Sequence, residues 1–403
     1  MVNTLHPVFA YIITVIVIIA TLLLYRKIHI SLMAGTFLYG FLTLEPLQIL
    51  ENTVKGSTNI HTMRLLTAII QALFIAAILK ESGVLDDITR GLVSINMRFA
   101  AFAIPALIGL IPMPGGALVS AMMTYDLYFN DLKMDRSQAS YINYWFRHIW
   151  VPIWPLYQAI ILTAALLQTS VYQVISYTYP AAIAGISIGI LYGLYIQRKT
   201  RGVEGRGGSI IDFLKHVWIF IEIIFLTIIL KIDISISLFI TLATVVAVYR
   251  PSRQAINKAL KTALDPKLLL IIFLAMIFRE FIVTSGAAHS MYQLLSDYNI
   301  NKYLIAFLIP LSIGIATAGE FVFAAIAFPI LLHLIYMPTG AIDPTTLLMG
   351  FTGGWIGVML SPAHLCIFLT VEYFKADVVK TFKHVYISAI ATVVLVVIGG
   401  FLL

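Results

Sequence analysis

Charged side chains are scarce in this sequence of 403 residues. Asp, Glu, Lys and Arg make up 11% of the chain, whereas hydrophobic residues make up 60%. A soluble domain needs a largely polar surface, and no polar stretch here is long enough to form one. Apolar runs of about 20 residues, the length at which a helix crosses ~30 Å of hydrocarbon, recur along the chain. The composition therefore predicts a multi-pass protein whose main partner is the lipid bilayer.

Cysteine and several catalytic motifs are also scarce or absent. The single cysteine, Cys366, lies in an apolar run, so neither a disulfide nor a cysteine-based metal site is expected. The sequence has no H-E-x-x-H motif and no G-x-x-x-x-G-K-[ST] loop, so neither a zinc protease nor ATP-driven pumping by this chain alone is expected. We expect no enzymatic activity, no metal and no cofactor.

The net charge of +7 comes from lysines and arginines in loops, which reflects membrane orientation rather than nucleic-acid binding. Segments 198–215 and 250–267 are rich in these residues and are predicted to be cytoplasmic. Counting crossings outward from them places both termini outside, together with the loops 51–62, 168–172 and 284–301.

The apolar runs predict an all-α polytopic membrane protein with about ten spans. The expected spans are 8–25, 29–50, 63–80, 138–168, 172–196, 215–230, 233–249, 267–283, 345–370 and 384–403. Two further stretches, 99–129 and 303–337, are interrupted by Pro112-Met-Pro-Gly-Gly116 and Thr317-Ala-Gly-Glu320. Each is expected to enter the membrane and return as a re-entrant hairpin with glycines at its tip. Segments 83–97 and 287–298 are expected to be amphipathic connectors at the surface.

Short motifs recur in the same order in the two halves of the chain. Lys27-Ile-His-Ile-Ser31 matches Lys231-Ile-Asp-Ile-Ser235, Ser82-Gly83 matches Ser285-Gly286, Ile104-Pro105 matches Ile309-Pro310, and Trp145…Pro152 matches Trp355…Pro362. Ordered matches indicate an internal duplication. We expect two inverted-topology repeats, 1–197 and 208–403, joined by a cytoplasmic linker at 198–207. Each repeat would hold one hairpin and one broken helix, at 138–168 and 345–370.

The stretch Asn143–Pro155, reading NYWFRHIWVPIWP, is the most informative part of the sequence. Arg147 and His148 are the only side chains of its apolar run, apart from tyrosines, that charge near neutral pH, and Pro152 and Pro155 follow them. Two prolines break a helix, and freed carbonyls at membrane depth are tolerated only inside protein or beside a water-filled cavity. A charge beside such a break is typical of a transporter's binding site. Snorkelling or one structural ion pair is the alternative for the arginine.

A substrate site is expected where the hairpin tips and helix breaks of the two halves meet. A guanidinium suits an anion because it offers several donors at once, and hairpin turns present backbone N–H groups. The residues expected to bind substrate are Pro112, Pro114, Gly115, Gly116, Asn143, Arg147, His148, Thr317, Gly319, Ser361 and His364. The alternatives are turn chemistry for the Pro-Gly tip, a hydrogen bond to a neighbouring helix for His148, and capping of a freed backbone group for Ser361.

Glu320 follows Gly319 at the second tip, where a carboxylate is costly unless it is paired, protonated or hydrated. We expect it to take part in ion coupling, and an ion pair with Arg147 is the alternative. Arg279 and Glu280 lie deep in the span 267–283 and are expected to be structural.

The order of spans, hairpin, broken helix and closing span resembles the ion transporter superfamily, which includes divalent-anion/sodium symporters and gluconate, citrate and arsenite permeases. The Pro112–Gly116 tip is similar to the proline-glycine tips of gluconate-type permeases, and the chain resembles the uncharacterised prokaryotic membrane family DUF401. The resemblance implies a secondary transporter of a small organic anion in the prokaryotic cell membrane, in an architecture whose members are often homodimers. Both tips lack the Ser-Asn-Thr sequence of sodium-coupled dicarboxylate members, which favours H⁺ over Na⁺ as the coupling ion.

Three classes of function are compatible with the sequence. A secondary transporter explains the repeat, the hairpins and the broken helices together. An ion channel would need a continuous polar path, and an intramembrane enzyme would need a catalytic constellation. If Trp145, Trp150 and Trp154 line the substrate site, monocarboxylates and weakly polar molecules are also compatible substrates.

Overall fold

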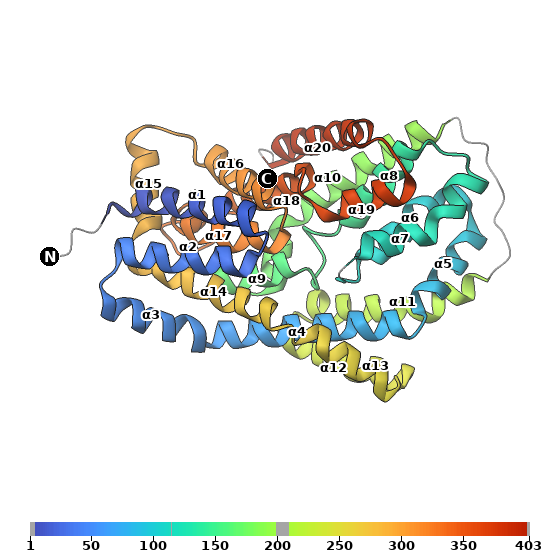
Figure 1. The fold of residues 1–403 in the computed structure, drawn as a ribbon, viewed down its shortest axis with the longest axis horizontal. Helices are drawn as coiled ribbons and strands as arrows, with labels where there is room; N and C mark the ends of the chain where they lie inside the picture. Colours follow the sequence, from blue (N-terminus) through green and yellow to red (C-terminus); the bar gives the residue numbers. More distant parts are fainter. Residues whose placement is uncertain (1–4, 114, 199–208, 401–403) are drawn as a thin grey trace.

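The computed structural model describes residues 5–113, 115–198 and 209–400, and these form a helical protein (Figure 1). The elements of the first half are α1 (Pro7–Tyr25), α2 (Ile28–Thr43), α3 (Pro46–Thr58), α4 (Ile60–Glu81), α5 (Val84–Ile95), α6 (Met97–Gly109), α7 (Gly116–Asp126), the π-helical turn η1 (Leu127–Asp131), α8 (Arg136–His148), α9 (Gln158–Leu166) and α10 (Val171–Gln197). Those of the second half are α11 (Ile210–Ile224), the π-helical turn η2 (Phe225–Ile229), α12 (Ile234–Tyr249), α13 (Arg253–Ala263), α14 (Pro266–Thr284), α15 (Ala287–Asp297), α16 (Lys302–Thr317), α17 (Glu320–Ile335), α18 (Pro344–Leu360), α19 (Leu365–Phe374) and α20 (Val378–Gly400).

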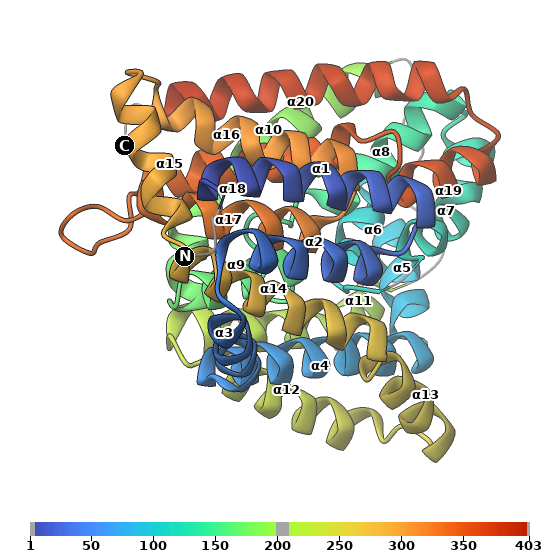
Figure 2. The ribbon, with the colours of Figure 1, turned by 60° about the vertical axis from the view of Figure 1, so that its left-hand side comes forward.

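The contacts between the first half, α1–α10, and the second half, α11–α20, come in pairs. Helix α2 packs against α14 and α12 against α4; α9 packs against α17 and α19 against α7; α10 packs against α18 and α20 against α8. Each helix number differs by ten between the two contacts of a pair. The contact between α2 and α14, for example, corresponds to the contact between α12 and α4. Figure 2 shows α3 and α15 at one end of the molecule and α13 at the other.

Among the described residues, five helical segments are long and apolar enough to cross a membrane, or six if Arg253–Thr284 (α13 and α14) and the bent α15 count as one span. The five are α1, α4, α10, α18 with α19, and α20. Further apolar helices, such as α2, α6, α12, α16 and α17, are shorter. This pattern is that of an integral membrane protein. The expected total of about ten spans also relied on these shorter helices.

Some expected boundaries are wrong. The span 29–50 ends at Thr43, because Pro46 cannot continue a helix and holds Glu45 extended. Glu45 and Gln48 then form a capping box that starts α3. The last span begins at Val378 rather than at residue 384.

The connectors expected at 83–97 and 287–298 are helices α5 and α15. Each starts after a glycine, with a φ of +72° at Gly83 and +71° at Gly286.

Each half contains a pair of helices joined by a tight turn where a hairpin was expected. Helix α6 ends at Gly109 and α7 begins at Gly116, and Gly115, directly before α7, has a φ of +71°. Helices α16 and α17 meet at Ala318 and Gly319, and Ala318 has a φ of +56°. Within α6, Pro105 has no N–H to give to Ala101 O, and the Tyr128 hydroxyl donates to that carbonyl instead at 2.7 Å.

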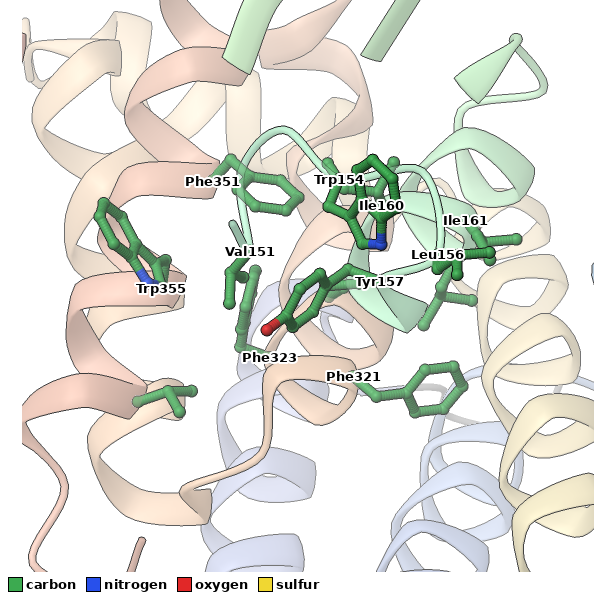
Figure 3. Close-up of a cluster of buried hydrophobic side chains, with 14 of the residues drawn as sticks. Val151, Trp154, Leu156, Tyr157, Ile160, Ile161, Phe321, Phe323, Phe351 and Trp355 are labelled. Atoms are coloured by element: carbon green, nitrogen blue, oxygen red, sulfur yellow. The ribbon is translucent and has the colours of Figure 1, made fainter. Parts of the chain in front are cut away.

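Both predicted helix breaks are present in the structure. Helix α8 ends at His148 and α9 begins at Gln158, and α18 ends at Leu360 before α19 begins at Leu365. Figure 3 shows Val151, Trp154 and Tyr157 of the first break in a buried cluster with Phe323 of α17 and Phe351 of α18. The break in one half is therefore covered by the hairpin and the broken helix of the other.

Candidate functional site

A cavity of about 480 Å³ lies between the two breaks and the two hairpin turns. Its lining includes Pro112, Met113, Gly115, Arg147, His148, Tyr157, Gln158, Gly319, Glu320, His364 and Cys366. It extends to Thr262 and Asp265, at the junction of α13 and α14. The cavity therefore combines polar groups from both halves and reaches toward the end of the molecule that carries α13.

The first hairpin is held beside the cavity by the break that follows α8. The indole of Trp150 donates to Ala106 O and that of Trp154 donates to Leu110 O, both at 2.7 Å. The Tyr157 hydroxyl lies 3.0 Å from Gly109 O. Carbonyls at a helix end have no partner within the helix, so these donors stabilise the last turn of α6.

The tryptophan-rich cavity lining expected from the sequence is wrong. Trp150 and Trp154 bond to α6, and Trp145 donates to Gly185 O at 3.0 Å. None of the three lines the cavity. Their role in the structure is to anchor neighbouring helices.

Arg147 lies at the end of α8, where its side chain is buried with 7% exposure. Its Nη1 lies 3.3 Å from His148 Nε2 and 3.6 Å from Cys366 Sγ, and its Nη2 lies 3.4 Å from Met113 O. Its buried Nε has no hydrogen-bond partner. Among the described residues, no carboxylate forms an ion pair with it. The guanidinium thus has long contacts and an unused donor, although a buried charge normally requires strong partners.

Gly116 gives Arg147 the space to lie at the hairpin tip. A Cβ at Gly116 would lie 2.4 Å from Arg147 Nη2, and a Cβ at Gly109 would lie 2.3 Å from Arg147 O. The two glycines allow α6 and α7 to approach both the backbone and the guanidinium of this residue. Pro112 and Gly115 line the cavity, whereas Pro114 lies outside the described residues.

His148, His364 and Cys366 gather next to Arg147. The Nδ1 of His148 lies 2.7 Å from Tyr144 O, and the Nδ1 of His364 lies 3.1 Å from Ala318 O. His148 and Arg147 face the same space although neighbouring helical residues point about 100° apart, because α8 ends at this position. Cys366 was missed as a site residue, and the pair His364-Leu-Cys366 beside the break was the signal in the sequence.

Glu320 begins α17, and its Oε1 lies 3.9 Å from His148 Nε2. The alternative partner considered for it, Arg147, does not pair with it in the part of the chain that the structure describes. Its side chain is 20% exposed, so the carboxylate has contact with the cavity. Gly319 lies beside it in the lining.

Besides Gly116, three expected substrate residues that the structure describes do not line this cavity. Asn143 donates to Ala117 O at 3.2 Å and to the Thr370 hydroxyl at 3.0 Å. Thr317 donates to Ile313 O at 2.7 Å, and Ser361 donates to Ile315 O at 2.6 Å. These hydrogen bonds join helices or satisfy backbone carbonyls, which is the capping role that was the alternative for Ser361.

Arg279 and Glu280 form a separate buried group. Arg279 bonds to Glu280 Oε1 and to Leu166 O, both at 2.6 Å, and Lys55 lies 2.8 Å from Glu280 Oε2. Because Leu166 and Lys55 belong to the first half, the group joins the halves.

The solved structure of the YdaH transporter from Alcanivorax borkumensis matches with a TM-score of 0.59 and 13% sequence identity, over 98% of this chain and 99% of that chain. At this identity the likeness shows a shared fold. A search of curated proteins gave no match. The model of one family, described as "Protein of unknown function (DUF401)", matches residues 6–402. The chain therefore belongs to the DUF401 family.

Proposed function

We propose that this protein is a secondary transporter that moves a small organic anion across a membrane through the cavity at Arg147. The observation that carries the proposal is the guanidinium of Arg147, which is buried, faces the cavity and lacks a carboxylate partner among the described residues. A carboxylate substrate would supply the missing acceptor in a bidentate geometry. The cavity volume of about 480 Å³ lies within the range of small-molecule sites.

Alternating access is the mechanism that the paired contacts of the two halves favour. If α1–α10 and α11–α20 are inverted repeats, exchanging their conformations would move the opening of the cavity from one side of the membrane to the other. The positive-inside rule then makes the α13 end cytoplasmic, because α13 carries Arg253, Lys258 and Lys261. In this conformation the cavity would open toward the cytoplasm.

Glu320 is the group that we assign to ion coupling. Its carboxylate contacts the cavity and lies next to His148. A carboxyl group near a cationic guanidinium is sensitive to whether an anionic substrate is bound, so proton and substrate binding would be linked. Na⁺ is the competing coupling ion. Its neutral ligands would be hydroxyl oxygens such as those of Thr317 and Ser361, which donate to backbone carbonyls and keep lone pairs.

An enzymatic function has one sequence pattern in its favour. Gly185-Ile-Ser-Ile-Gly189 matches the G-x-S-x-G motif of serine hydrolases. In those enzymes the serine occupies a sharp turn between a strand and a helix, whereas here the motif lies within α10. The motif glycines instead pack against Trp355 and Trp145.

The first experiment identifies a ligand and then measures its flux. The purified protein is screened by thermal shift against mono- and dicarboxylic acids, and the best acid is tested for counterflow in proteoliposomes. Saturable counterflow supports a carrier, whereas unitary conductance steps support a channel.

Arg147→Lys tests the role of the guanidinium. It keeps the positive charge but loses the planar fork, so uptake should fall about tenfold or more. Arg90→Lys, at an exposed ion pair with Asp87, is the matched control and should transport normally. An Arg147→Lys protein with normal uptake and apparent affinity would exclude bidentate binding of the substrate.

A further inference from the structure

Three metal-ligating atoms converge in the wall of the cavity. One ring nitrogen of His148, one ring nitrogen of His364 and Cys366 Sγ lie within 4.8 Å of one another, and both imidazoles are buried. We propose that His148, His364 and Cys366 form a binding site for a divalent transition-metal ion of the zinc class. The proposal concerns metal binding and does not depend on the transport activity proposed above.

Both histidines are held in the form that a metal requires. A backbone carbonyl can only accept a hydrogen bond, so the contacts to Tyr144 O and Ala318 O place a proton on each Nδ1. Each Nε2 therefore keeps a lone pair that is free to bind a metal ion. Backbone partners of this kind typically orient metal-ligating histidines.

His364 provides a second, independent observation. Its Nε2 is buried and has no hydrogen-bond partner among the described residues, while the residue as a whole is 6% exposed. A buried lone pair without a donor is unfavourable, because the nitrogen has lost water and gained nothing in return. A bound cation would satisfy it.

The dimensions of the cluster are close to those of a zinc site. Bonds of about 2.0–2.3 Å in a tetrahedron place the ligand atoms about 3.3–3.8 Å apart. The ligand atoms now lie up to 4.8 Å apart. Side-chain movements of about 1 Å would bring them to the distances of a tetrahedral site. Two imidazoles and a thiolate favour Zn²⁺, Co²⁺ or Ni²⁺ over Na⁺ or Mg²⁺. The fourth position would face Glu320 Oε1, 3.9 Å from His148 Nε2, or water in the cavity.

Arg147 competes with the metal for the same atoms. Its Nη1 lies 3.3 Å from His148 Nε2 and 3.6 Å from Cys366 Sγ, so it occupies the space that the ion would enter. Metal binding therefore has to displace the guanidinium, and the two states of the site exclude each other. It follows that removing the guanidinium should strengthen metal binding.

Co²⁺ is the probe for the test, because a cobalt–thiolate bond gives a charge-transfer band in the near ultraviolet. The full-length protein in detergent is treated with a chelator, freed of it, and titrated with Co²⁺. We expect one Co²⁺ per chain and a thiolate band. The band can be assigned without ambiguity because Cys366 is the only cysteine.

Variants then identify the ligands. Cys366→Ser should abolish the thiolate band, and His364→Ala should weaken Co²⁺ binding about tenfold or more. His333→Ala is the matched control, since His333 pairs with His289 elsewhere in the protein, with ring centroids 5.4 Å apart. It should leave the band and the affinity unchanged. Arg147→Met should raise the affinity for Co²⁺ about tenfold, the effect of removing one hydrogen bond from a charged donor.

The proposal is overturned if folded wild-type protein gives no thiolate band, or if His364→Ala binds Co²⁺ with wild-type affinity. Unchanged affinity in Arg147→Met would overturn the competition between metal and guanidinium. Monodisperse elution and helical circular dichroism establish that each variant is folded. If Cys366→Ser does not fold, alkylation of Cys366 in the wild-type protein replaces it. Zn²⁺ should then slow alkylation, and an unchanged rate counts against the site.

Discussion

Replacing Gly116 with alanine should weaken anion binding without changing any charge in the cavity. The added Cβ would lie 2.4 Å from Arg147 Nη2, 2.9 Å from Nε and 3.0 Å from Cζ. Ordinary van der Waals contact begins at 3.4 Å, so the guanidinium has to move by about 1 Å. Because the clashing atoms end a long side chain and are not backbone, we expect the protein to remain folded and the guanidinium to shift.

The expected magnitude follows from the hydrogen bonds that such a shift breaks. A hydrogen bond to a charged group contributes about 1.5–3 kcal/mol, and the loss of one corresponds to a roughly 10- to 150-fold higher Kd. The Kd of the acid selected by thermal-shift screening is measured by isothermal titration calorimetry for the wild type, Gly116→Ala and Gly399→Ala. The last is the control, because a Cβ at Gly399 meets no atom within 4 Å.

Wild-type affinity in Gly116→Ala would refute this reasoning, since an anion held by the guanidinium has to sense its displacement. Equal weakening in Gly399→Ala would point to a general effect of alanine on the protein. Gly109→Ala separates local displacement from misfolding, because its Cβ would lie 2.3 Å from the backbone oxygen of Arg147. That variant should lose stability as well as binding.

Three further predictions concern topology, coupling and packing. In a Cys366→Ala background, an impermeant thiol reagent on intact cells should label a cysteine at position 299 and not one at 205, which lies outside the described residues; the reverse pattern would invert the orientation. Glu320→Gln should retain substrate exchange in proteoliposomes but lose accumulation driven by a pH gradient, and wild-type accumulation that follows only a sodium gradient would contradict the proton role. Gly353→Ala should destabilise the protein by about 1–3 kcal/mol relative to Gly399→Ala in thermal unfolding, because its Cβ would lie 2.1 Å from Phe307 O. Equal stability of the two variants would show that α16 and α18 can separate freely.

Local chemistry explains which parts of the fold the sequence predicted well. Proline removes a donor and glycine permits positive φ, so the breaks after His148 and Leu360 and the turn at Gly115 could be located from single residues. The stop at Thr43 was missed although the same chemistry was present in Glu45-Pro46. The hydrophobic pattern did not show it, because the apolar residues of α3 continue those of α2.

The site itself was harder to predict, because a sequence does not show which way a buried side chain turns. Asn143 lies one turn before Arg147 on α8, yet it bonds to α7 and α19 and does not reach the cavity. Thr317 and Ser361 likewise bond to carbonyls of α16. Each of these side chains is polar and lies near a helix break or a hairpin tip. A polar side chain at such a place can bind a ligand or can form a hydrogen bond to a backbone group that the break has left unpaired. Only the packing decides between these uses.

Cys366 shows why matching halves do not predict a matching site. If Trp145 is aligned with Trp355, then His364 takes the position of Trp154 and Cys366 that of Leu156. The first break uses those positions to bond α6 and to fill the core, while the second break directs its imidazole and thiol toward Arg147 and His148. The two halves thus supply two similar breaks, but the first contributes the guanidinium and one imidazole, whereas the second contributes an imidazole and a thiol. The cluster forms only because the fold brings the two breaks together, so its residues share no spacing in the sequence that a motif could describe.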